Sequence, residues 1–94
     1  MALFDVIGQR WTLRIIWELH EHAPLTFRAL QERCEGMSSS VLSARLGLLR
    51  EVALVETGDA GYRLTGQGVE LVARLGPLLQ WSESWAAALA EAGD

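Results

Sequence analysis

The chain has 94 residues, enough for one domain, and half of them are hydrophobic. Its net charge of −4 at neutral pH argues against a strongly basic nucleic-acid-binding protein, but the charge is unevenly distributed. Residues 25–50 carry four arginines against two glutamates, whereas residues 51–94 carry two arginines against seven acidic residues. The middle of the chain is therefore its only positive stretch.

The sequence contains no sign of export or membrane insertion. No segment reaches the roughly 18 uninterrupted apolar residues that a membrane span requires. Asp5 and Arg10 follow Met1 too closely for a signal-peptide core. The single cysteine excludes an internal disulfide, which is consistent with a reducing compartment. We therefore expect a cytoplasmic protein without a membrane span, and the high apolar content favours a partner that covers part of its surface.

The first helix is expected to begin at about Leu3 or at Arg10 and to end at His22. Apolar residues recur there at the spacing of one helix face: Trp11, Ile15, Ile16 and Leu19. Pro24 ends this helix, because proline disfavours helical geometry in the residue before it. His20 and His22 are two positions apart, so their imidazoles point about 200° apart on a helix, and we expect no metal site.

A very short strand at Leu25-Thr26 and a second helix from Phe27 to about Cys34 are expected after the proline. Thr26 can serve as the N-cap of this helix, and Gly36 breaks it. The inner face contains Phe27, Leu30 and Cys34. Cys34 therefore occupies a core position, where burial as a small apolar residue is the expected role and a redox switch is the alternative.

A third helix is expected at about residues 39–52. One of three consecutive serines is its N-cap: Ser38, Ser39 or Ser40. The apolar stripe contains Leu42, Leu46, Leu49 and Ala53. The opposite face contains Ser40, Ser43, Ala44 and Gly47. This face is small and uncharged, and Arg50 flanks one side of it.

A β-hairpin is expected next, at about residues 54–64. Residues 54–57 alternate as a strand, residues 58–61 have turn chemistry, and residues 62–64 return as the second strand. The hairpin would form the wing of a winged-helix domain.

A long helical segment completes the chain. Thr65 caps a fourth helix from Gly66 to about Leu75, Gly76-Pro77 interrupts it, and a last helix ends at about Ala90. Residues near heptad spacing form an apolar seam for another helix: Leu71, Leu75, Leu78, Ser82, Trp85 and Leu89.

The order of these elements predicts a single mainly α domain over residues 1–94. A helix pair with a tight break, followed by a two-stranded hairpin, is the winged helix-turn-helix arrangement. In that arrangement the third helix is the recognition helix, which enters the major groove of double-stranded DNA.

The chain resembles the HxlR-type winged-helix transcriptional regulators, relatives of the MarR group, over about residues 3–85. The matching runs are Ile7-Gly8, Arg10-Trp11-Thr12-Leu13, Phe27-Arg28-Ala29-Leu30, Gly36-Met37-Ser38, Leu42-Ser43-Ala44-Arg45-Leu46, Leu49, Leu54-Val55, Tyr62-Arg63-Leu64-Thr65, Gly68, Leu71 and Trp81. Their order and spacing together carry the resemblance. It implies a bacterial, homodimeric DNA-binding transcription factor without catalytic activity, whose dimer forms mainly through its terminal helices.

Seven residues are candidates for contact with DNA. Serine hydroxyls can donate to phosphates or base edges, and arginines can bind phosphates. The candidates are Arg28, Ser39, Ser40, Ser43, Arg45, Arg50 and Arg63. Each has an alternative role: capping or helix surface for the serines, solvated surface for the arginines, and for Arg45 a structural ion pair that braces the helix.

The dimerisation helix is expected at about residues 66–90. The candidate interface residues are large and apolar and belong to the terminal helices: Trp11, Leu78, Trp81, Trp85 and Leu89. The four tryptophans, Trp17 included, predict core and interface packing. The alternative is a pocket for an aromatic small-molecule effector between the protomers.

The sequence contains no motif for catalysis, for a cofactor or for a metal. There is no P-loop, no metal-spaced set of cysteines and histidines, and no nucleophile with an evident base beside it. Two functions stay open. The first is a dimeric, sequence-specific DNA-binding transcriptional regulator. The second is a degenerate winged-helix domain that acts as a protein-interaction or small-ligand-binding module, which the uncharged recognition face and the absence of lysine favour.

Overall fold

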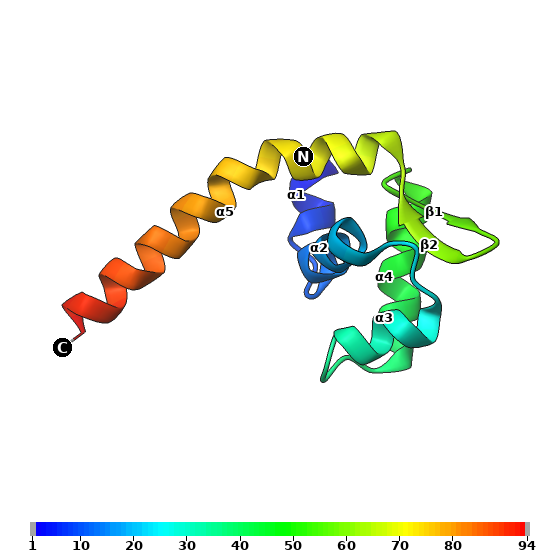
Figure 1. The fold of residues 1–94 in the computed structure, drawn as a ribbon, viewed down its shortest axis with the longest axis horizontal. Helices are drawn as coiled ribbons and strands as arrows, with labels where there is room; N and C mark the ends of the chain where they lie inside the picture. Colours follow the sequence, from blue (N-terminus) through cyan, green and yellow to red (C-terminus); the bar gives the residue numbers. More distant parts are fainter. Residues whose placement is uncertain (1, 94) are drawn as a thin grey trace.

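The computed structural model describes residues 2–93, which fold into helices around one two-stranded sheet (Figure 1). The elements in chain order are α1 (Ala2–Ile7), α2 (Thr12–His22), α3 (Phe27–Arg33), α4 (Ser39–Glu51), β1 (Val55–Gly58), β2 (Gly61–Leu64) and α5 (Gly66–Ala92). The first four helices and the hairpin form the body, whereas α5 crosses the body and then continues beyond it as an arm. The predicted mainly α fold with a small hairpin is confirmed.

The first predicted helix is two helices, α1 and α2, separated by a turn at residues 8–11. Gly8 donates its N–H to the Phe4 carbonyl at 2.9 Å, and a Cβ at Gly8 would lie 2.6 Å from that oxygen, so only glycine fits. Trp11 then adopts a φ of 76°, in the left-handed region, which an uninterrupted helix cannot accommodate. Of the two start points considered from the sequence, Leu3 lies in α1, whereas Arg10 lies in the turn, two residues before α2 begins.

Hydroxyl side chains cap the three later helices. Each accepts a hydrogen bond from the backbone N–H three residues further on, at 3.1, 3.2 and 3.1 Å respectively: Thr26 for α3, Ser38 for α4 and Thr65 for α5. Of the three candidate serines, Ser38 is the cap, which places Ser39 and Ser40 inside the first turn of α4.

The recognition helix expected at residues 39–52 corresponds to α4, and most of its apolar stripe is buried. Leu42, Leu46 and Leu49 are in the core. Ala53 was expected in the same stripe, and this was wrong: α4 ends at Glu51, and Ala53 is exposed with a φ of 61°. The chain leaves the helix there to enter the hairpin.

The hairpin pairs β1 and β2 in antiparallel register, with Val55 opposite Leu64 and Gly58 opposite Gly61. Leu25 adds one bridge to Tyr62, through backbone hydrogen bonds of 3.1 and 2.7 Å. The short strand expected at Leu25-Thr26 is therefore a single paired residue, which attaches β2, near the turn of the hairpin, to the segment before α3.

The core lies among α2, α3, α4 and β1. Its buried hydrophobic residues are Val6, Ile15, Ile16, Leu19, Leu25, Leu30, Cys34, Met37, Leu42, Leu46, Leu49, Val55 and Val72. Helix α5 contributes Val72 to this core. The helix can lie this close to the body because Gly68 has no Cβ; a Cβ there would overlap the Leu54 carbonyl oxygen. The first half of α5 is thereby held against the body.

Helix α5 is continuous from Gly66 to Ala92, so the interruption expected at Gly76-Pro77 was wrong. Proline removes one backbone hydrogen bond and commonly bends a helix without ending it. Figure 1 shows α5 bending in its middle, between its yellow and orange parts. Despite its 27 residues, neither α5 nor any other helix within residues 2–93 combines the length and apolar character of a membrane span.

Candidate nucleic-acid interface

The exposed face of α4 is small, polar and uncharged over most of its length. Ser40, Ser43, Ala44 and Gly47 are all exposed, on the side away from the buried leucines, and Ser39 is exposed as the first residue of the helix. The hydroxyl of Ser40 lies 3.2 Å from that of Ser38, the capping residue. A Cβ at Gly47 would meet no atom within 4 Å, so this face is open to a partner.

Arg50 lies on α4 and makes no ion pair within residues 2–93. It is exposed in the last turn of α4. Together with Gly47 and Thr57 it lines a shallow depression between α4 and β1, in which Glu51 and Glu56 also take part. The unpaired guanidinium of Arg50 therefore lies where α4 meets the hairpin.

Arg28 and Arg63 are exposed but have carboxylate partners. Arg28 on α3 lies 3.6 Å from Glu32, with 91 % of its side chain exposed. Arg63 on β2 lies 3.2 Å from Glu56, its partner in the hairpin register. Because exposed ion pairs contribute little stability, a phosphate can compete for both guanidinium groups.

Arg45 points to the turn between α1 and α2. Its Nε donates to the backbone carbonyl of Arg10 at 2.8 Å. A bracing role was one of the two expectations for this residue, and the acceptor is a backbone carbonyl rather than the carboxylate of an ion pair.

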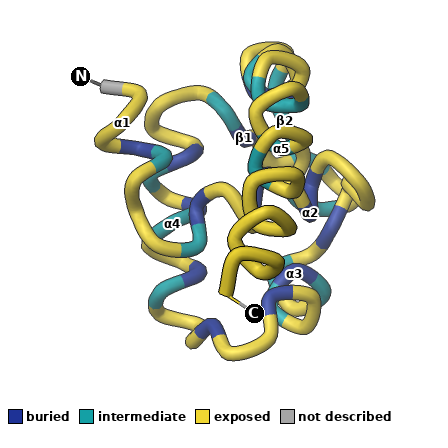
Figure 2. The backbone as a smooth tube through the Cα atoms, turned by 90° about the vertical axis from the view of Figure 1, so that its left-hand side faces the viewer, coloured by how far each residue is buried: buried dark blue, intermediate teal, exposed yellow. Residues whose placement is uncertain are grey.

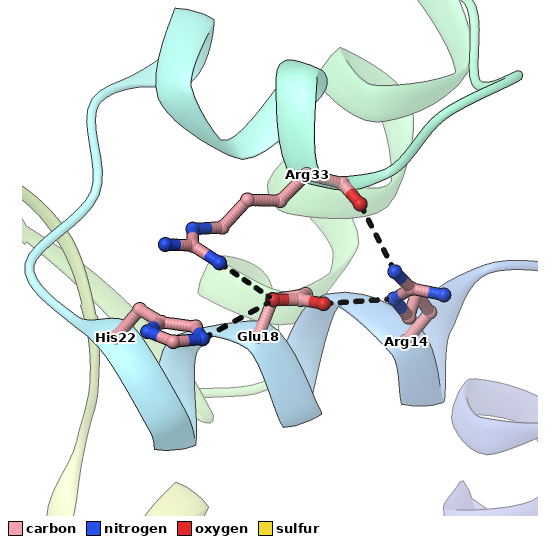
Figure 3. Close-up of polar contacts among 4 residues, drawn as sticks. All are labelled: Arg14, Glu18, His22 and Arg33. Atoms are coloured by element: carbon pink, nitrogen blue, oxygen red, sulfur yellow. Dashed lines mark hydrogen bonds and ion pairs between the residues drawn. The ribbon is translucent and has the colours of Figure 1, made fainter.

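A buried carboxylate connects α2 to α3, and the sequence interpretation missed it (Figure 3). Glu18, with 11 % of its side chain exposed, lies 3.0 Å from Arg14, 3.8 Å from Arg33 and 4.0 Å from His22. Arg14 also donates to the Arg33 carbonyl at 3.0 Å. The i,i+4 spacing of Arg14, Glu18 and His22 was the available signal. The cluster therefore joins α2 to α3 through charged side chains.

Cys34 is fully buried at the end of α3, as expected. Burial raises the pKa of its thiol above the ordinary value of 9.0, an effect that nearby Arg14 opposes and Glu18 reinforces. His20 and His22 diverge, as their spacing predicts: His22 faces Glu18, and the ring of His20 lies 5.4 Å from that of Trp17.

Four of the five predicted interface residues lie on the arm of α5. Leu78, Trp81, Trp85 and Leu89 are each between 52 % and 58 % exposed. The indoles of Trp81 and Trp85 stack, with centroids 5.4 Å apart and planes 8° from parallel. Figure 2 shows the last turns of α5 exposed all around. These side chains form an apolar surface that the body does not cover.

Trp11, the fifth predicted interface residue, belongs to a different surface. Its ring is half-buried against the core, and its Cη2 lies 3.9 Å from the position of a Cβ at Gly36, in the turn between α3 and α4. The guanidinium carbon of Arg10 lies 5.6 Å from the indole centroid. Trp11 therefore packs against the body, beside the turn before α4, and not with the four residues on the arm.

An apolar groove of about 320 Å³ lies between α2 and α5. Its lining residues are Leu13, Ile16, Trp17, Val72, Leu75, Leu78, Leu79, Ser82 and Glu83. The sequence placed Trp17 on a terminal helix, but only the packing of α5 on α2 shows that the two helices enclose a groove. Its opening adjoins the exposed apolar surface of the arm.

Comparisons with known proteins agree on one family. The family model for the HxlR-like helix-turn-helix matches residues 6–90. Quinone-bound YodB from B. subtilis is 29 % identical, with a TM-score of 0.81, over 88 % of this chain and 93 % of that chain. A possible HxlR family transcriptional factor from Thermoplasma volcanium is 27 % identical, with a TM-score of 0.82, over 93 % of this chain and 84 % of that chain. Among curated proteins, no sequence matches the chain.

Proposed function

The chain belongs to the HxlR-like helix-turn-helix family, and from this premise we propose that it is a dimeric transcriptional regulator that inserts α4 into the major groove of DNA. One observation carries the proposal: the exposed, open face of α4 ends at an unpaired arginine beside the wing. A helix of this kind fits the major groove closely, because no bulky side chain stands between it and the bases.

The roles of the side chains follow from their positions. Ser40 and Ser43 face the bases, whereas Arg28, Arg50 and Arg63 bind phosphates around them. The middle of the α4 face carries no arginine to contact guanine, so specificity depends on small-residue contacts and on DNA shape. Three phosphate contacts per protomer give about six per dimer. The logarithm of the DNA affinity should then fall with the logarithm of the salt concentration with a slope near −5.

The dimer forms through the apolar surface of α5. Water would otherwise cover four large side chains, two of them tryptophans, on an arm that the body leaves uncovered. A two-fold symmetric interface buries the same residues on both copies and is the commonest kind in homo-oligomers. A two-fold axis would also relate the two copies of α4, as binding to two half-sites requires.

A charge reversal on α4 tests this function. Gly47→Glu adds a carboxylate to the open face without a steric clash, so it should abolish binding to a pool of genomic duplexes at low salt, as measured by fluorescence anisotropy. Ala73→Glu makes the same charge change at an exposed position of α5 and should bind like the parent. If the parent binds no duplex at low salt, or if Gly47→Glu binds as the parent does, the proposal is wrong.

A protein-interaction module is the second candidate, and the net charge of −4 favours it. The uncharged face of α4 would then contact a protein. Failure of the parent to bind any duplex, together with an intact dimer, would make this the better account.

The groove between α2 and α5 supports a further part of the proposal, an aromatic effector. Its apolar lining and its tryptophan suit a planar aromatic molecule, and the related YodB has been crystallised with a quinone. Quinones should quench the tryptophan fluorescence saturably, and Leu13→Gln, at the groove, should weaken this binding. Val69→Gln, exposed on α5 outside the groove, is the control. Equal binding by both variants would place the ligand elsewhere.

A further inference from the structure

The turn between α1 and α2, at residues 8–11, packs beside the recognition helix. Arg45 in the middle of α4 donates to the Arg10 carbonyl at 2.8 Å. The Trp11 ring reaches Gly36, in the turn that precedes α4. The turn therefore lies along one edge of α4, from the middle of the helix to the segment before its first residue.

This turn is held in a defined conformation. Trp11 has a φ of 76°, which a bulky residue keeps only where its surroundings impose it. Its carbonyl accepts the Ile15 N–H at 3.0 Å, and the Gln9 carbonyl accepts the Thr12 N–H at 3.2 Å. The backbone that carries Arg10 is consequently fixed relative to α4.

The side chain of Arg10 is available to an anion. It is exposed, and it makes no ion pair within residues 2–93. Its guanidinium stacks over the Trp11 indole, which orients the group while leaving its N–H edges free. A guanidinium edge is well suited to two parallel hydrogen bonds with a phosphate.

Arg10 and Arg50 lie on opposite edges of the reading face. At 100° per residue, Arg45 and Arg50 are about 220° apart across the exposed side of α4, with Ser40, Ala44 and Gly47 between them. Arg50 stands on the edge next to the wing, and Arg45 holds Arg10 on the other edge. A helix in the major groove has a phosphate backbone on each side, so each edge needs its own cation.

We propose that Arg10 is a further DNA-backbone contact, presented by the turn at residues 8–11, and that Arg45 is the positioning residue that holds this turn beside the recognition helix. This proposal rests on the proposed DNA binding. It adds a contact to the phosphate backbone on the edge of α4 opposite Arg50. It raises the phosphate contacts from about six to about eight per dimer, and the expected salt slope from near −5 to near −7.

Salt-dependent binding of Arg10→Ala to one duplex tests the contact. The variant should bind specific and random duplexes more weakly, and its salt slope should flatten by about 1.8, because each dimer loses two phosphate contacts. Arg74→Ala, which removes an exposed arginine paired with Glu70 on α5, should keep the parent slope. If the parent binds and Arg10→Ala keeps its slope, the contact is wrong and DNA binding stands. If the parent binds no duplex, both proposals fail.

A double-mutant cycle tests the role of Arg45. In the parent, Arg45→Met should lower the DNA affinity and flatten the salt slope. In the Arg10→Ala background it should cause almost no further change, because Arg45 affects DNA binding only by positioning the turn that carries Arg10. Thermal unfolding of the same variants separates this from a general loss of stability. A further slope loss of about 1.8 in the double variant would show that Arg45 binds phosphate itself, and would overturn the positioning role.

Discussion

The roles that we propose for Arg50 and Ser43 differ although both residues lie on α4, and single substitutions separate them. Arg50→Ala should remove two phosphate contacts per dimer, so the salt slope should flatten by about 1.8, and specific and random DNA should both bind more weakly. Ser43→Ala should lower affinity mainly for the specific site. Binding titrations over a salt series measure both effects. An unchanged slope for Arg50→Ala would remove Arg50 from the contact set.

Cys34 should react slowly in the folded protein. Only the thiolate is a nucleophile, and burial raises the pKa of this thiol, so labelling at pH 8 should be slower than in denatured protein and should still be rising with pH above 9.0, where an ordinary thiol levels off. A raised folded pKa means that the thiol contributes stability below its ordinary pKa, and that this contribution is lost as pH rises through the folded value. Denatured protein is the control. Rapid labelling of the folded protein, or loss of DNA binding under mild oxidant, would favour a redox switch.

Replacing the same cysteine tests its packing. Cys34→Ala should lower the free energy of unfolding by about 1 kcal/mol, because it leaves a small cavity, with DNA binding unchanged.

Residue roles could be predicted from the sequence where they depend on local spacing. The burial of Cys34 and the caps at Thr26 and Thr65 follow from helix periodicity and capping chemistry. The acceptor of Arg45 could not be predicted, because it is a backbone carbonyl 35 residues earlier, in a turn whose geometry is tertiary.

Between elements, the Glu18 cluster should stabilise the packing of α2 on α3. Glu18→Gln leaves Arg14 and Arg33 without their shared carboxylate, and since both arginines are about half exposed, the cost should be about 1–2 kcal/mol, below that of a fully buried pair. Glu21→Gln, exposed on the same helix, should change stability by less than about 0.5 kcal/mol. Chemical denaturation at one protein concentration compares them. Equal stability of both variants would contradict the role given to Glu18.

For α5, the central prediction is dimerisation through the arm. Trp85→Ala should weaken the dimer by about 2 kcal/mol or more, roughly thirtyfold in the dissociation constant, because buried aromatics dominate interface energies. Val69→Ala, exposed on the first half of α5, should not. Sedimentation at micromolar concentration measures this. A monomeric parent, or a Trp85→Ala protein that dimerises as tightly as the parent, would contradict the interface.

Element boundaries could be predicted only where a side chain determines them locally. The hairpin and α4 lie close to their expected ranges because turn residues and Ser38 mark their limits. The break before α2 depends on the close approach of Gly8 to the Phe4 carbonyl, which no periodicity shows. At Pro77 the sequence predicted a break that is absent, because a proline inside a long apolar helix can bend the helix without ending it.

At the scale of the whole molecule, charge and shape are arranged around α4. The exposed arginines Arg10 and Arg50 flank the open face of α4, while Glu83 and Glu91 lie on the arm of α5, which extends away from the body (Figure 1). A net charge of −4 is therefore compatible with a locally attractive surface for DNA. Pairing two arms would join two such surfaces about one two-fold axis.

The proposed binding of a dimer to two DNA half-sites is best tested by footprinting on a duplex selected from genomic fragments. Two copies of α4 related by the dimer axis should protect two half-sites, one helical turn or about 34 Å apart centre to centre, in a pseudo-palindromic sequence. Two symmetric protected segments are expected, and both should disappear in Gly47→Glu. A single protected half-site, or no duplex enriched above random DNA, would contradict it.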